Sequence, residues 1–144
     1  MRGSAQRRLQ PVDFWLALGE NTTLAPGTFV VETQADNYQD LRLKDVLGQR
    51  GNGTGGLPYT IDKLPTGNAA INAFLGGAPT STTPGNYVCD EMAYDLYSAL
   101  GHGVNAGAFV HVSGSGNLNA IGEALAWRLW FALMVEKGKA QNGK

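Results

Sequence analysis

Cys89 and His111 carry the chemistry in this sequence that best suits covalent catalysis. A thiolate attacks carbonyl carbon readily, and an imidazole can take the thiol proton and return it to a leaving group. Cys89 is the only cysteine, so it forms no disulfide within the chain, and a reducing compartment is expected. The pair indicates a thiol hydrolase. The alternative left open is that Cys89 is a small buried apolar residue and His111 an ordinary core histidine.

The residues around Cys89 predict the start of a helix. Pro84 and Gly85 precede it, and apolar residues at helical spacing follow from Cys89 to Leu100, before a glycine. Unpaired amide groups and the macrodipole at a helix start favour an anion. We therefore expect the helix start, together with a histidine partner, to lower the pKa of the Cys89 thiol. His111 lies in the apolar segment Ala108–Val112, which is a predicted strand.

Segments with strand and helix periodicity alternate along the chain, which is typical of an α/β fold. We expect a three-layer sandwich with a mostly parallel sheet flanked by helices. The domain should span residues 11–138, after a loosely held leader at 1–10 and before a flexible tail at 139–144. The other expected strands are Val12–Leu18, ended by Gly19, Thr28–Val31 and Thr80–Thr83, and the other expected helices are Asn68–Leu75, capped by Thr66 and ended by Gly76 and Gly77, and Leu118–Val135.

Charge and composition exclude several classes of partner. Lysine and arginine number 11 against 12 aspartate and glutamate residues, so no basic surface is expected to collect nucleic acid. No apolar run reaches membrane-spanning length, and Arg2, Arg7 and Arg8 are followed by Pro11 rather than by a signal-peptide core. We expect a cytoplasmic protein with no membrane partner.

Neither a phosphate-binding loop nor a metal site is indicated. The glycine-rich segment 48–56, GQRGNGTGG, lacks the GK[ST] ending of a phosphate cradle, and we expect an exposed loop there. One cysteine and two histidines without close spacing do not form a zinc motif, and His102 should be solvated in a loop. No metal and no cofactor are therefore expected.

The segment STTPGNYVCD, ending at Asp90, resembles the active-site cysteine motif of pyroglutamyl peptidase type I. That motif reads Ser-x-Thr-Ala-Gly-x-Tyr-Val-Cys-Asn/Asp, and Pro84 stands where alanine is usual. The segment from Gly107 to Ser113 is similar to the family's histidine strand, Gly-x-Phe-x-His-Val-Pro, with Ser113 in place of proline. The resemblance covers about Pro11 to Lys137.

The same resemblance suggests a third catalytic residue. Glu32 opens ETQADNYQDLRLKD, which aligns without a gap with the family stretch Glu-Arg-x-Ala-x-Asn-x-x-Asp-x-Arg-x-x-Asp, although Thr33 replaces the usual basic residue. The family carries out hydrolysis with a Cys-His-Glu triad, so the resemblance implies Cys89, His111 and Glu32. Arg42 matches a family arginine near the active site, where it would support the oxyanion or the glutamate. Alternatives are a solvated carboxylate for Glu32 and a surface ion pair for Arg42.

The resemblance implies a cysteine omega-peptidase that removes N-terminal pyroglutamate from peptides. Tyr87 and Val88 would belong to the substrate pocket, and Glu20 stands where the family usually has glutamine. The chain starts after the family's Gly-Phe-x-Pro-Phe region, whose phenylalanines help to enclose the ring, so reduced activity is expected. The alternative is a weak or inactive shortened relative that binds peptide ends or a partner, and a homo-oligomer is also left open.

Overall fold

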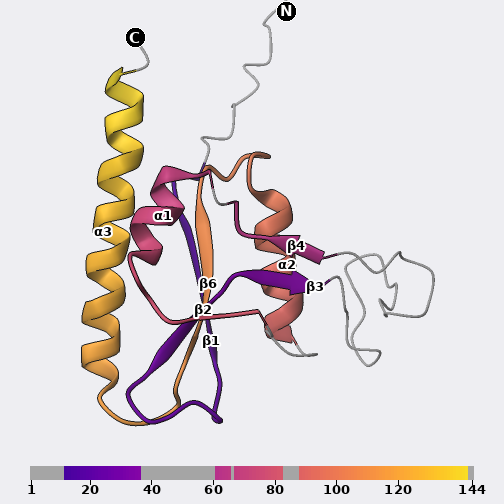
Figure 1. Ribbon diagram of the computed structural model, residues 1–144, viewed down its shortest axis with the longest axis vertical. Helices are drawn as coiled ribbons and strands as arrows, with labels where there is room; N and C mark the ends of the chain where they lie inside the picture. The colour runs from indigo at the N-terminus through magenta and orange to yellow at the C-terminus, as the bar shows by residue number, and fades with distance from the viewer. Residues whose placement is uncertain (1–11, 37–60, 66, 83–87, 143–144) are drawn as a thin grey trace, which may run out of the picture.

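The computed structural model describes residues 12–36, 61–65, 67–82 and 88–142, which form three layers (Figure 1). A sheet lies in the middle, with α1 (Ala69–Leu75) and α3 (Leu118–Asn142) on one side and α2 (Val88–Ala99) on the other. This arrangement confirms the predicted α/β sandwich. The expected leader at 1–10 and the glycine-rich loop at 48–56 lie outside the described residues.

The main sheet has the strand order β1 (Trp15–Glu20), β6 (Gly107–Val112), β2 (Phe29–Glu32), β5 (Thr80–Ser81). β1 pairs with β6 and β2 with β5 in parallel, whereas β2 runs antiparallel to β6. The sheet is therefore mixed. β6 has five consecutive buried residues, because helices cover both faces of this inner strand.

β1 continues through Gly19, so the prediction that this glycine ends the strand was wrong. The backbone of Gly19 is paired with that of His111, and Glu20 is paired with Val112. Glycine was interpreted as a breaker because it weakens a strand, but a strand retains it where another group approaches closely. Such a close approach occurs at Gly19, where Cys89, Phe109 and His111 come near its backbone.

α1 begins after Asn68, whose side chain accepts a hydrogen bond from the Ile71 amide at 3.0 Å. This corrects the predicted cap at Thr66. Gly76 ends the helix as expected, with φ at 37°, in the left-handed region that glycine adopts most easily. Ile71 and Phe74 are fully buried and anchor the helix to the core.

α3 continues to Asn142, past the predicted end at Val135, because Gly138 does not interrupt it. Ile121, Leu125 and Ala132 form its buried side, and its packing against α1 is extensive. Arg128 donates hydrogen bonds to the carbonyl oxygens of Phe74, at 3.0 Å, and Leu75. These bonds satisfy carbonyls at the end of α1, which have no partner within that helix.

By length and composition alone, α3 could cross a membrane over Leu118–Gly138, with a mean hydropathy of 1.2. This corrects the expectation that no apolar run reaches spanning length. One such helix is weak evidence, and its inner face packs on α1 in the manner of a helix covering a core.

α2 covers the opposite face of the sheet, with Ala93, Leu96 and Tyr97 buried beneath it. Beside α2, β3 (Gln34–Asp36) and β4 (Ile61–Lys63) form a small antiparallel ribbon that the sequence analysis did not predict. β3 follows β2 after one residue, so the ribbon extends from the strand that carries Glu32.

Candidate active site

Glu32 and His111 form a buried pair at the centre of the sheet. Glu32 Oε1 lies 2.7 Å from His111 Nδ1, and the two residues are 1% and 4% exposed. In the antiparallel ladder Glu32 is opposite Phe109, so its side chain reaches His111 diagonally on the same face. The His111 ring also stands edge-on to the Phe109 ring, at 4.9 Å between centroids. This packing and the carboxylate fix the imidazole orientation.

Cys89 approaches the same place from the second residue of α2. A β-carbon built on Gly19 would lie 2.8 Å from Cys89 Sγ and 3.3 Å from His111 Cδ2. Those two distances add to 6.1 Å, which is the greatest separation that the sulfur and Cδ2 can have. Cδ2 is bonded to Nε2, the ring nitrogen not facing Glu32. The structure therefore brings Cys89, His111 and Glu32 together on one face of the sheet.

Gly19 makes this approach possible, a role that the sequence analysis did not recognise. Its hypothetical β-carbon would also lie 2.7 Å from Phe109 Cζ, closer than real contacts allow. Any side chain at this position would displace the sulfur or the aromatic ring. The only sequence signal was a glycine inside an apolar strand, which can mark close approach.

The environment of Cys89 raises the pKa of its thiol, first through burial and second through the negative charge of Glu32. This corrects the expectation that the helix start and histidine lower it. Both causes disfavour the thiolate. The resting sulfur is therefore a thiol, and a base must accept its proton before it can act as a nucleophile.

Tyr97, from the third turn of α2, links strands β2 and β6. Its hydroxyl donates to the backbone carbonyl of Glu32 and accepts from the Phe109 amide at 3.2 Å. Glu32 and Phe109 are opposite each other in the ladder, so the hydroxyl bridges β2 and β6. Burial is the main cause that raises the pKa of Tyr97. Sequence reasoning missed this residue because it looks like an ordinary helix position.

The second carboxylate oxygen of Glu32, Oε2, is buried and has no hydrogen-bond partner within the described part of the chain. A buried carboxylate oxygen without a partner carries a large desolvation cost. An oxygen of this kind is suited to receive a donor at a functional site.

Among the other predicted site residues, the structure places Glu20 away from this face. Glu20 is exposed and lines a hollow of about 320 Å³ with Leu118 and Leu125 of α3. Because side chains alternate along a strand, Glu20 faces the side of the sheet opposite to Gly19. Arg42 and Tyr87 lie outside the described residues, and Val88 is the first residue of α2.

His102 is exposed after α2, as expected. Across the described ranges, no group of three His, Cys, Asp or Glu residues is arranged to hold a metal ion.

Comparison with known proteins gives a match in structure only. No family model and no curated sequence matches the chain. Among solved structures, it resembles pyroglutamyl peptidase I from Bacillus amyloliquefaciens at 23% identity and a TM-score of 0.52, covering 83% of this chain and 65% of that one. Pyrrolidone carboxyl peptidases from Fervidobacterium islandicum and Pyrococcus furiosus match at 22% identity and TM-scores of 0.53. These cover 90% and 87% of this chain, and 70% and 71% of theirs.

The fold of this chain is therefore of the α/β class, with a mixed sheet flanked by helices. More particularly, its fold is similar to that of pyroglutamyl peptidases, and it spans about two thirds of the length of the Bacillus enzyme.

Proposed function

We propose that this protein is a cysteine peptidase that removes N-terminal pyroglutamate from peptides. The observation that supports this most strongly is the convergence of Cys89 Sγ and His111 Cδ2 over Gly19, with Glu32 on the other side of the imidazole. Three elements distant in sequence supply a nucleophile, a base and a carboxylate in the order that acyl transfer requires. The fold, similar to that of pyroglutamyl peptidases, supports the choice of substrate.

The proposed reaction begins with a neutral thiol, because burial and Glu32 raise the pKa of Cys89. As a carboxylate, Glu32 only accepts hydrogen bonds, so Nδ1 of His111 carries the hydrogen and Nε2 is free to act as base. Nε2 takes the thiol proton while Sγ attacks the carbonyl carbon after the pyroglutamyl ring. His111 then gives that proton to the departing amine as the C–N bond breaks, which leaves an acyl-thioester on Cys89.

Hydrolysis of the thioester follows the same path with water as the nucleophile. His111 takes a proton from water, and the proton returns to the sulfur as the C–S bond breaks. Backbone amides at the start of α2, next to Cys89, are suited to hold the oxyanion formed in each half-reaction.

We also propose Arg42 as the partner of Glu32 Oε2, the buried oxygen described above. An arginine there would offset the desolvation of the carboxylate and hold it against His111. Tyr87 and Val88, which directly precede Cys89 in the sequence, would contact the substrate ring. Glu20 stays a proposed pocket residue from the sequence alone, and a cytoplasmic location also stays a proposal.

Hydrolysis of pyroglutamyl-coumarin amide tests this function, with prolyl-coumarin amide as a matched substrate. Proline has the same ring size but a charged amine in place of the neutral lactam. We expect release of coumarin from the first substrate only, and its loss in Cys89→Ala. Equal cleavage of both substrates, or cleavage that survives in Cys89→Ala, would refute the proposal.

A further inference from the structure

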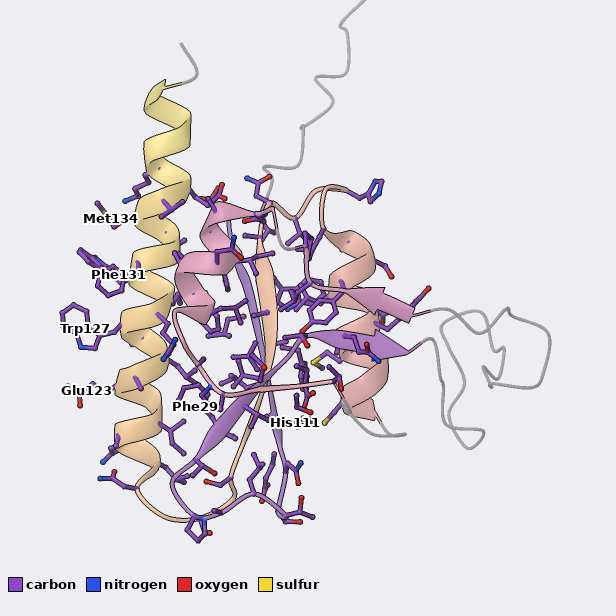
Figure 2. The ribbon with its side chains drawn as sticks, in the orientation of Figure 1. Phe29, His111, Glu123, Trp127, Phe131 and Met134 are labelled. Carbon is purple, nitrogen blue, oxygen red and sulfur yellow. The ribbon has the colours of Figure 1, made fainter. Side chains whose placement is uncertain are left out.

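The outer face of α3 carries a row of large apolar side chains that no described element covers. Trp127, Trp130, Phe131 and Met134 are each about half exposed, at 57%, 51%, 51% and 49%. Figure 2 shows Trp127, Phe131 and Met134 pointing away from α1 and the sheet. The three aromatic rings contact one another, with centroids 5.2 to 6.3 Å apart. A contiguous apolar patch of this kind on a soluble fold marks an interaction surface.

The row ends in opposite charges placed symmetrically about Trp130. Glu123 lies seven residues before Trp130 and Lys137 lies seven residues after it, which is about 10 Å along the axis in each direction. Both side chains are exposed, and Figure 2 shows Glu123 on the same outer face. Neither forms an ion pair with another residue in the described ranges. If a second copy packs antiparallel on this face, opposite charges therefore meet at both ends.

A hollow in the same face of α3 can receive a side chain from a second copy packed antiparallel to the first. It measures about 490 Å³ and is lined by Glu123, Ala126, Trp127 and Trp130. Residues at positions i, i+3, i+4 and i+7 form the four-residue hole that receives a knob in helix packing. If two α3 helices pack antiparallel about an axis at Trp130, the residue of the second copy level with the centre of this hole is Met134.

From these observations we propose that two copies of this chain form an antiparallel dimer through the outer faces of α3. The two-fold axis passes level with Trp130, so each Glu123 faces Lys137 of the other copy and each Met134 enters the hole of the other copy. Such a contact is isologous, since each residue pair occurs twice. A crossing angle of about 20° keeps the ends of the helices within reach of these long side chains.

The area of the apolar face on α3 determines how tightly the proposed dimer should bind. An aromatic side chain buries roughly 150–250 Å² in a full contact, and about half of each ring is still exposed here. The three aromatic side chains of two copies then supply roughly 600 Å², before the flanks of α3 are counted. This is below the roughly 1,200 Å² at which standard specific interfaces begin, so we expect a weak dimer with a dissociation constant of about 1–100 µM.

A second copy fits this face better than a membrane surface does. Helices that lie on membranes carry Lys and Arg beside their apolar face. Within Leu118–Gly138 the charged residues balance, and Arg128 is occupied by carbonyl oxygens of α1. The other charged residues of this span are Glu123, Glu136 and Lys137. Over Leu118–Gly138, the outer face of α3 therefore has no basic flank to hold anionic lipid.

Sedimentation velocity of the full chain under reducing conditions tests whether the outer face of α3 forms a dimer. We expect a concentration-dependent dimer, and we expect Trp130→Ala to weaken it at least about tenfold. A reductant excludes a dimer linked through Cys89. Circular dichroism and thermal unfolding show whether each variant keeps the fold.

A charge swap tests the register. Glu123→Lys and Lys137→Glu should each weaken the dimer about tenfold at low salt, because each change places like charges opposite at both ends. The double variant should restore the wild-type dissociation constant within about threefold. Asp13→Lys makes the same change in charge at an exposed residue before β1 and should have no effect.

Three results would overturn the proposal. They are a monomer at about 1 mM, a dimer unaffected by Trp130→Ala, and a double variant no better than the single ones. Sedimentation with phosphatidylserine vesicles is the further check. Trp130-dependent binding to vesicles by a chain that stays monomeric would assign the face to a membrane instead.

Discussion

Glu32 Oε1 lies 2.7 Å from His111 Nδ1 in the interior between β2 and β6, and almost none of either side chain is exposed. A buried ionic pair is costly to desolvate, and apolar residues of similar volume are often as stable in its place. The packing of the core therefore does not account for the pair. Its orientation toward Cys89 across Gly19 fits the proposed catalysis, because an imidazole held by a carboxylate stays in the tautomer that a general base needs.

Glu32→Gln should lower kcat for pyroglutamyl-coumarin amide at least about 100-fold while the fold is kept. An amide can hold the ring but does not stabilise the imidazolium that forms when His111 takes the thiol proton. Asp13→Asn, an equivalent change at an exposed residue, should leave kcat unchanged. Steady-state kinetics with circular dichroism checks both variants. A Glu32→Gln protein with wild-type kcat would show that the carboxylate has no part in turnover.

The pH profile of Cys89 alkylation should have its midpoint above the pKa of an ordinary thiol, about 8.5. Only the thiolate reacts with iodoacetamide, and burial and the charge of Glu32 both raise the pKa of this thiol. Glu32→Gln removes that charge, so the midpoint should move to lower pH. The rate of alkylation, followed by intact mass from pH 6 to 11, gives both midpoints. A wild-type midpoint below that of a free thiol would contradict this account of the site.

Gly19→Ala should disable the site, since the added methyl group would meet Phe109 Cζ and Cys89 Sγ at less than 3 Å. We expect a loss of turnover of about 100-fold and a stability loss of about 1–3 kcal/mol from overpacking. Gly138→Ala is the matched control, because nothing lies within 4 Å of its added carbon and alanine favours a helix. Chemical denaturation and kinetics measure the two effects. Equal behaviour of the two variants would mean that Gly19 does not make room for the sulfur.

Tyr97 should titrate above the ordinary range of a tyrosine and should make stability dependent on pH in alkali. Its pKa is raised in the folded state, mainly by burial, so the folded protein holds this proton more tightly than the unfolded chain. Stability from this group is complete below about pH 10, the unfolded value, and declines as the pH rises above it. Tyr97→Phe should remove the late step in absorbance at 295 nm. It should also cost about 1–3 kcal/mol at neutral pH, because two backbone groups lose their bridge.

Local patterns predicted most of the elements. The apolar run around His111 became β6, and helical spacing after Cys89 became α2 within one residue at each end. Strand order could not be predicted, because the antiparallel pairing of β2 with β6 joins segments about 80 residues apart. The choice of Asn68 over Thr66 as the α1 cap was also out of reach, since both residue types cap helices well.

The site, like the fold, has features that the sequence could predict and features that it could not. The resemblance to known peptidases named Cys89, His111 and Glu32, and their proximity is present in the structure. The raised pKa of Cys89 could not be predicted, because a helix start is visible in sequence whereas burial and the distance to Glu32 are not. Tyr97 acts through its hydroxyl across two strands, and neither strand is near it in sequence.

Covalent trapping on Cys89 tests the central claim most directly. The protein is mixed with a pyroglutamyl-coumarin amide, quenched in acid within the first turnovers, and examined by intact mass and peptide mapping. We predict a pyroglutamyl adduct on the peptide containing Cys89, and no adduct in Cys89→Ala. His111→Ala should form the adduct far more slowly, because the neutral thiol then lacks its base. Hydrolysis that proceeds with no adduct, or with an adduct at another residue, would contradict the assignment of Cys89 as the nucleophile.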